Sequence, residues 1–207
     1  VGNVPIHDIP KSVIKVTGPS AYLKISDGCN APCTFCVIPK IKGALKSASV
    51  GRLVNEAHRL VEAGAKELVL AAQDSTAWGE DLGIKNGLPE LLEILGHEVG
   101  PDVWLRLMYA YPSRVRPPLI EAMAKIPNVV PYLDVPLQHG SENMLRKMRR
   151  PWKNSKTREM IANLRDAIPE ITLRTSLIVG FPGESDDDIL ELLEFLEEIM
   201  FDHVGVF

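Results

Sequence analysis

Short apolar segments alternate with amphipathic segments from residue 22 to the end of the chain. Glu67–Ala71 has the length and composition of a buried strand, whereas Val50–Val61 carries apolar side chains at helical spacing. Ser49 is a suitable N-cap for that helix and Gly64 a suitable end. Strands that alternate with helices pair in parallel through right-handed crossovers. The sequence therefore predicts an α/β fold with parallel strands, either a doubly wound sheet or a complete or partial barrel.

Six strands and six helices are expected along the chain. The strands are Tyr22–Ser26, Glu67–Ala71, Val103–Met108, Val129–Val135, Ile171–Val179 and Asp202–Phe207. The helices are Val50–Val61, Leu88–Glu98, Pro118–Lys125, Glu142–Met148, Ser155–Ala167 and one that Ser185 opens with a capping box to Asp188. In both architectures ligands bind at the carboxyl ends of the strands.

Composition limits the class of protein. With 207 residues, 45% hydrophobic and 24% charged, the chain suits one globular domain and excludes disorder. Apolar runs such as Leu68–Ala72 are too short to cross a membrane. A net charge of −4 gives no general attraction to nucleic acid or anionic lipid. We expect a cytoplasmic protein with no membrane or DNA partner. Residues 1–20 are expected to form an arm or linker, with one short strand at Ser12–Val16.

Three cysteines lie within eight residues, in the loop that follows the first expected strand. Cys29, Cys33 and Cys36 are spaced C-x3-C-x2-C, and an odd number packed this closely makes a poor disulfide framework. A zinc site would need a fourth ligand, which a histidine could supply through the fold, and unrelated core cysteines are a further alternative. An iron–sulfur cluster with three protein ligands would leave one iron open for chemistry. The spacing favours the cluster.

The cysteine spacing, with Phe35 before the third cysteine, resembles the radical S-adenosylmethionine (SAM) superfamily. The run YLKISDGCNAPCTFCVIPKIKG resembles the methylthiotransferases, and KELVLAAQDST, WLRLMYAYP, YLDVPLQHGSENMLRKMRR and LRTSLIVGFPGESDDD extend the match over nearly all of residues 21–207. The AQD at 72–74 and the YAYP at 109–112 resemble the branch that modifies an aspartate of a small-subunit ribosomal protein. The alternatives are the tRNA-adenosine branch and, from another class, a non-enzymatic metal- or cluster-binding module.

The resemblance implies a partial (βα)6 barrel, a 4Fe-4S cluster on Cys29, Cys33 and Cys36, and SAM chelated to the open iron. It implies reductive cleavage of SAM to a 5′-deoxyadenosyl radical, followed by methylthio insertion at the β-carbon of the aspartate. The implied partners are the ribosomal protein and a reductant protein. Full-length relatives also carry an N-terminal cluster domain and a C-terminal β domain. Residues 21–207 are therefore expected to be an excised catalytic core.

Polar residues at the ends of two expected strands are candidates for cofactor binding. Gln73 and Asp74 end the second strand and suit the amino group of SAM or the substrate, or else cap the loop that follows. Gln138 follows the fourth strand and suits a ribose hydroxyl or a carboxylate, or an ordinary loop hydrogen bond. Phe35 is expected beside the cluster and the adenine, or packed within its loop.

Two arginines inside expected strands and one glycine are the remaining candidates for cofactor binding. Arg106 and Arg174 would be costly in buried strands unless paired, so an anionic ligand such as the methionine carboxylate or a structural ion pair is expected. Gly180 opens a glycine-rich turn that lets backbone approach the adenosyl part of a cofactor, or only shapes the turn. Lys42 and Lys46 stand where the family usually carries arginines. A basic run between residues 146 and 158 suits a patch beside an RNA-rich ribosomal substrate or, more commonly, a solvated helix face.

Overall fold

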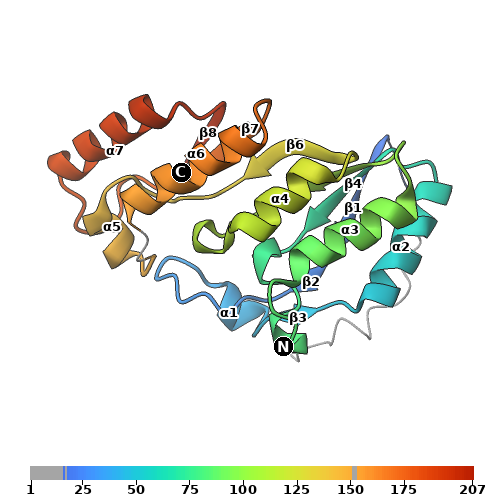
Figure 1. Ribbon diagram of the computed structural model, residues 1–207. Helices are drawn as coiled ribbons and strands as arrows, with labels where there is room; N and C mark the ends of the chain where they lie inside the picture. Colours follow the sequence, from blue (N-terminus) through green and yellow to red (C-terminus); the bar gives the residue numbers. More distant parts are fainter. Residues whose placement is uncertain (1–15, 17, 151–152) are drawn as a thin grey trace.

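The computed structural model describes residue 16, residues 18–150 and residues 153–207 (Figure 1). The strand expected at Ser12–Val16, like most of the expected N-terminal arm, lies outside these residues apart from Val16, which is not in a strand. None of the helices in the described part of the chain combines the length and the apolar character needed to cross a membrane.

Six parallel strands form one sheet in which every strand pairs with the next along the chain. They are β1 (Ser20–Lys24), β4 (Glu67–Ala71), β5 (Trp104–Leu107), β6 (Val129–Asp134), β7 (Thr172–Leu177) and β8 (His203–Val206). A doubly wound sheet would reverse its strand order at a switch point, and this order never reverses. The outer strands β1 and β8 do not pair with each other, so the barrel is open. The expected partial (βα)6 barrel is confirmed.

Helices follow the strands on the outer side of the sheet, as Figure 1 shows for α3, α4 and α6. Their bounds are α1 (Ile38–Ile41), α2 (Val50–Glu62), α3 (Gly87–Val99), α4 (Pro117–Lys125), α5 (Glu142–Lys147), α6 (Asn154–Ala167) and α7 (Asp186–Ile199). The six expected helices are present to within a residue or two at each end. Sequence periodicity missed α1 and the two-residue antiparallel strands β2 (Ser26–Asp27) and β3 (Lys46–Ser47), because such short elements carry no period.

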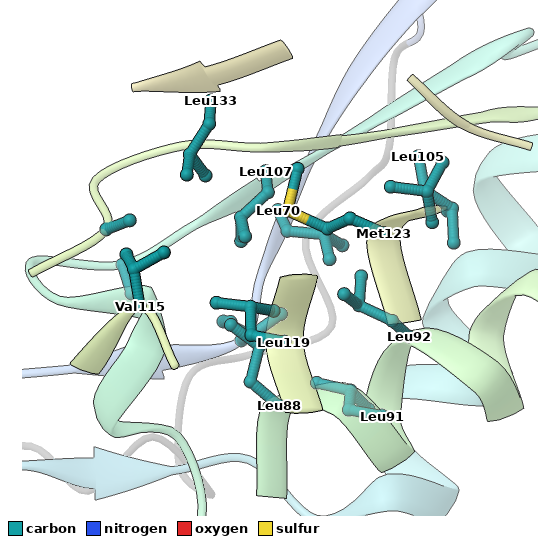
Figure 2. Close-up of a cluster of buried hydrophobic side chains, with 14 of the residues drawn as sticks. Leu70, Leu88, Leu91, Leu92, Leu105, Leu107, Val115, Leu119, Met123 and Leu133 are labelled. Atoms are coloured by element: carbon teal, nitrogen blue, oxygen red, sulfur yellow. The ribbon is translucent and has the colours of Figure 1, made fainter. Parts of the chain in front are cut away.

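The core lies between the outer face of the sheet and the helices (Figure 2). Leu70, Leu105 and Leu107 on the strands are fully buried, as are Leu91 and Leu92 of α3. Because side chains alternate across a strand, the residues between these leucines point to the inner face of the barrel. That inner face carries polar and aromatic side chains, among them Tyr22, Glu67, Arg106, Tyr132 and Arg174. The helix-side core thus leaves the inner face available for binding.

A buried carboxylate joins the starts of α5 and α7. Asp188 accepts hydrogen bonds from the hydroxyls of Ser141 (2.5 Å) and Ser185 (2.8 Å) and from the Asn143 amide (3.1 Å). The capping box expected between Ser185 and Asp188 is confirmed. The Ser141 hydroxyl in particular holds the pKa of Asp188 well below its ordinary value, against the opposing effect of burial.

Replacing Asp188 with asparagine should lower the free energy of unfolding by about 3 kcal/mol, because four donors, the Ser185 N–H included, lose a charged acceptor. The native pKa is lowered, so the stabilisation is present above the ordinary carboxyl pKa of 3.8 and is lost as the pH falls below it. Urea unfolding of the wild type, D188N and D187N at pH 7 and pH 3 measures both effects. Asp187 is exposed in the same turn and serves as the matched control. Equal stabilities of D188N and D187N at pH 7 would contradict the prediction.

Candidate active site

The cysteine loop lies at the carboxyl end of the sheet and is held at both sides. The β2–β3 pair closes its base, and the Cys29 N–H donates to the Gly43 carbonyl at 3.2 Å. On the far side the Thr34 N–H donates to the carbonyl of Met148 (3.1 Å), and the Thr34 hydroxyl donates to that of Lys147 (3.0 Å). The loop is therefore fixed between the first strand and the end of α5.

All three cysteines line one cavity of about 500 Å³, which we call the cysteine cavity. Its walls come from the cysteine loop, from the ends of β1, β4 and β5, and from the end of the α5 segment. The lining residues are Tyr22, Lys24, Cys29, Ala31, Cys33, Phe35, Cys36, Ile38, Ala71, Ala72, Gln73, Asp74, Tyr109, Tyr111 and Arg150. The structure thus brings six of the ten expected site residues together: the three cysteines, Phe35, Gln73 and Asp74.

The cysteines suit a cluster better than a single ion. Each is a free thiol, half-buried on the cavity wall. Burial raises the pKa of the Cys29 thiol, although the Ala31 N–H that donates to its sulfur at 3.3 Å acts in the opposite direction. Among the described residues, no group of three His, Cys, Asp or Glu side chains is close enough to hold one metal ion. A 4Fe-4S cluster does not require such convergence, because each thiolate binds a different iron.

Gln73 and Asp74 line the cavity just after the end of β4, and they differ in their hydrogen bonding. The Gln73 Oε1 atom is buried and has no hydrogen-bond partner, which leaves an acceptor for a ligand that donates N–H or O–H. Asp74 is buried and already paired, since it accepts from Arg114 at 3.0 Å and from the Thr76 hydroxyl at 2.5 Å. Burial raises the pKa of Asp74 in spite of these two donors.

The structure does not bring Arg106 and Arg174 to the cysteine cavity. Arg106 donates to Glu67 at 2.7 Å and lies over the Tyr132 ring at 4.7 Å, beside a separate cavity at the start of β5 and β6. Arg174 donates to Asp134 at 2.7 Å. The sequence left open whether these arginines bind an anionic ligand or form ion pairs within the protein. In the structure each forms an ion pair with a carboxylate on a neighbouring strand.

Gln138 and Gly180 also lie outside the residues that line the cavity. Gln138 has a φ of 79° and bonds through its backbone to β7, where its N–H donates to the Ser176 carbonyl at 2.9 Å. Gly180 has a φ of 71°, and its N–H donates to Glu184 at 2.7 Å. Both positions have a positive φ in a strand-to-helix turn, and their roles in cofactor binding stay predictions.

Five lining residues have roles that sequence reasoning missed: Tyr22, Lys24, Tyr109, Tyr111 and Arg150. Two of them, Tyr109 and Tyr111, belong to the YAYP segment, which carried the family resemblance but predicted no site role for either. Arg150 was hidden in the basic run, where charge alone cannot separate a cavity residue from a solvated one. Lys24 is paired with Asp27 at 2.6 Å, and Lys42 reaches the same carboxylate at 3.5 Å.

The sequence model described as the radical SAM superfamily matches residues 23–196. The chain belongs to the radical SAM superfamily. Solved structures with a similar fold include the radical SAM methyltransferase TsrM from Kitasatospora setae, with a TM-score of 0.73, 17% identity, and coverage of 91% of this chain and 36% of that one. Another is the coproporphyrinogen III oxidase HemN from Escherichia coli, with a TM-score of 0.67, 15% identity, and coverage of 91% and 44%.

Curated relatives confirm the resemblance to the methylthiotransferases. "Ribosomal protein uS12 methylthiotransferase RimO" from Herpetosiphon aurantiacus is 54% identical over 191 residues, which covers 92% of this chain and 41% of the relative. The protein of the same name from Thermotoga maritima is 45% identical over 189 residues, which covers 91% and 44%. The chain therefore spans about two fifths of the length of these relatives.

Proposed function

We propose that residues 21–207 are the catalytic core of a radical SAM methylthiotransferase that acts on ribosomal protein uS12. The observation that carries the proposal is the joint placement of Cys29, Cys33, Cys36 and Gln73 on one cavity at the carboxyl end of a partial barrel. Relatives that are 54% identical and carry the uS12 methylthiotransferase name support the substrate. A reductant protein and a cytoplasmic location belong to the same proposal.

Different residues of the cavity would bind the cluster and SAM. Cys29, Cys33 and Cys36 would hold three irons of a 4Fe-4S cluster, and the free Gln73 Oε1 would accept from the amino group of SAM. Phe35, between two of these ligands, offers an apolar face for the cofactor. The cluster and SAM, when bound, supply the radical chemistry that the side chains themselves lack. The tyrosines at 109 and 111 add aromatic surface to the same cavity.

Anaerobic reconstitution with iron and sulfide, followed by EPR of the reduced protein, tests the cofactor part of the proposal. We expect a 4Fe-4S signal that changes when SAM is added, together with formation of 5′-deoxyadenosine. If the protein retains zinc, or if the EPR spectrum of its cluster does not change when SAM is added, the proposed enzymatic function is refuted. The three cysteines would then form a structural site.

A second arm of the same experiment tests the substrate. A uS12 peptide with deuterium at the β-carbon of the target aspartate should transfer deuterium into 5′-deoxyadenosine, because the radical removes hydrogen from that carbon. The matched control is the same peptide with deuterium at the α-carbon, which should transfer none. Transfer from a labelled tRNA fragment in place of the peptide would assign the chain to the tRNA branch.

A further inference from the structure

Arg174 lies on the inner face of the barrel with one edge of its guanidinium unused. Its Nη1 atom donates to the Asp134 carboxylate of the neighbouring strand at 2.7 Å and to the Ser176 hydroxyl at 3.3 Å. Nε and Nη2 have no partner among the described residues, and the side chain is 32% exposed. In Arg114 and Arg158, by contrast, Nε and Nη2 both donate to a carboxylate. The edge that binds a carboxylate in those two arginines is thus free in Arg174.

The last strand of the sheet leaves room beside that free edge. Gly205 lies opposite Ser176 in the register of β7 and β8. A Cβ at position 205 would lie 3.3 Å from the Arg174 Nη2 atom, which is closer than an ordinary van der Waals contact. A glycine inside a strand often marks a place that another group approaches closely. Any larger residue at position 205 would therefore narrow the space that the free edge faces.

Asp134 connects Arg174 to a wall of the cysteine cavity. Its side chain is fully buried, and its second oxygen accepts from the Tyr109 N–H at 3.3 Å. Tyr109 lines the cysteine cavity and has a φ of 58°, which is a strained conformation for a bulky residue. Asp134 raises the pKa of Arg174, and Tyr132 and Tyr109 add to this effect, so both tyrosines lie within electrostatic range of the guanidinium. Backbone strain of this kind is retained where a binding site requires it.

We propose that Arg174 binds the side-chain carboxylate of the substrate aspartate through Nε and Nη2, with Asp134 as its positioning residue. The inference rests on the proposed function, which supplies an aspartate as the substrate. A carboxylate matches this edge of a guanidinium with two parallel hydrogen bonds. The carboxyl carbon is bonded directly to the β-carbon that is modified, so holding the carboxylate also places the reacting carbon. A tRNA adenosine has no carboxylate, so the same contact contributes to substrate choice.

The carboxylate of SAM and a purely structural ion pair are the two alternatives. Arg174 is not among the residues that line the cysteine cavity, where the cysteines and Gln73 would bind SAM. This placement favours the substrate over the cofactor. An ion pair that served only to join β6 to β7 would have no need of an open edge beside Gly205, and it predicts no coupling to any group of a ligand.

Two variants that differ only in the guanidinium test the proposal. Asp134→Asn keeps Arg174 and an acceptor for its Nη1 atom, and the double variant Asp134→Asn/Arg174→Gln removes the guanidinium without leaving a buried carboxylate unpaired. Fluorescence anisotropy measures the dissociation constants of uS12 peptides with aspartate or asparagine at the target position. The protein is reconstituted, loaded with SAM and left unreduced, so that SAM stays intact.

The matched control is Arg158→Gln/Glu198→Gln, which removes an ion pair of 2.6 Å on the outer surface. A third variant, Gly205→Ala, crowds the Nη2 atom of Arg174 but leaves the charge in place. Thermal melts establish that each variant folds.

The wild type should bind the aspartate peptide more tightly than the asparagine peptide. The ratio of the two dissociation constants should be at least as large in Asp134→Asn, because a competing negative charge is gone. It should be about tenfold smaller in the double variant, and reduced to a lesser extent in Gly205→Ala. The control should keep the ratio of the wild type.

A double variant with the same ratio as Asp134→Asn would overturn the proposal, as would a wild type that binds neither peptide or shows no preference for aspartate. The dissociation constant of SAM should be equal in these two variants. A change in SAM binding with an unchanged peptide ratio would assign Arg174 to the cofactor and would overturn the proposal too. A wild type whose cluster does not respond to SAM would count against the proposed function instead, and the peptide ratio measured without SAM would then decide on Arg174.

Discussion

The Cys33→Ala variant should lose the 4Fe-4S signal and should cleave SAM about 10³-fold more slowly than the wild type or not at all. The three cysteines line one cavity and would each hold a different iron of one cluster. Groups that act as a unit do not contribute additively, so one removal costs about as much as removing all three. EPR amplitude, iron content and 5′-deoxyadenosine formation measure the loss.

The prediction also concerns how the effects of the three cysteine replacements combine. A variant with all three cysteines replaced should be no worse than Cys33→Ala. Thr34→Val is the matched control in the same loop: it removes the hydroxyl bond to Lys147 but leaves the Thr34 N–H bonded to Met148. It should keep both the cluster and the cleavage. A Cys33→Ala protein that still assembles a SAM-sensitive cluster would contradict the ligand assignment.

Gly28→Ala should destabilise the protein by about 3 kcal/mol or more and should reduce cluster assembly. Gly28 has a φ of +72°, which an alanine adopts only at a cost. A Cβ there would lie 2.2 Å from the Ala44 carbonyl oxygen and 2.7 Å from that of Gly43. Both atoms belong to the backbone that bonds the Cys29 N–H, so relief of the clash must move the cysteine loop.

Two other glycines separate the clash from the backbone strain. Gly64 has a φ of +102° with open space around it, so Gly64→Ala should cost only about 1 kcal/mol. Gly51 lies in α2 with open space and a negative φ, so Gly51→Ala should stabilise by about 0.5–1 kcal/mol. Neither variant should change iron content. Chemical denaturation of the three proteins supplies the free energies, and a Gly28→Ala protein as stable as Gly64→Ala would refute the proposed close approach.

Local patterns were sufficient for the strands and the long helices. The run at Glu67–Ala71 and the capping box at Ser185 both correspond to observed elements, because burial and end-capping are decided within a few residues. The grouping of the three cysteines was also predictable from the sequence, since their spacing lies inside one loop. Short elements gave no signal, among them β2, β3 and α1 in and beside that loop.

The sequence did not show which charged side chains pair with each other across neighbouring strands. Arg106 and Arg174 have the same sequence context as a ligand-binding arginine inside a strand, yet each forms an ion pair with a carboxylate of a neighbouring strand, Glu67 and Asp134 respectively. Arg150 is the reverse case: the sequence places it in a solvated basic run, and the fold places it on the cysteine cavity over Tyr111. Partners so distant in sequence are fixed by strand order and register, which no local pattern encodes.

The sequence by itself determined the parallel α/β class, the three-cysteine motif and the resemblance to one enzyme family, because each depends on residues close together in the chain. Periodicity left a doubly wound sheet and a barrel open and the resemblance implied the barrel, but the tertiary structure decided the choice, since it depends on the order in which strands pair. The tertiary structure also decided that Arg106, Arg114 and Arg174 are paired with carboxylates, because such pairing depends on contacts between residues far apart in the sequence.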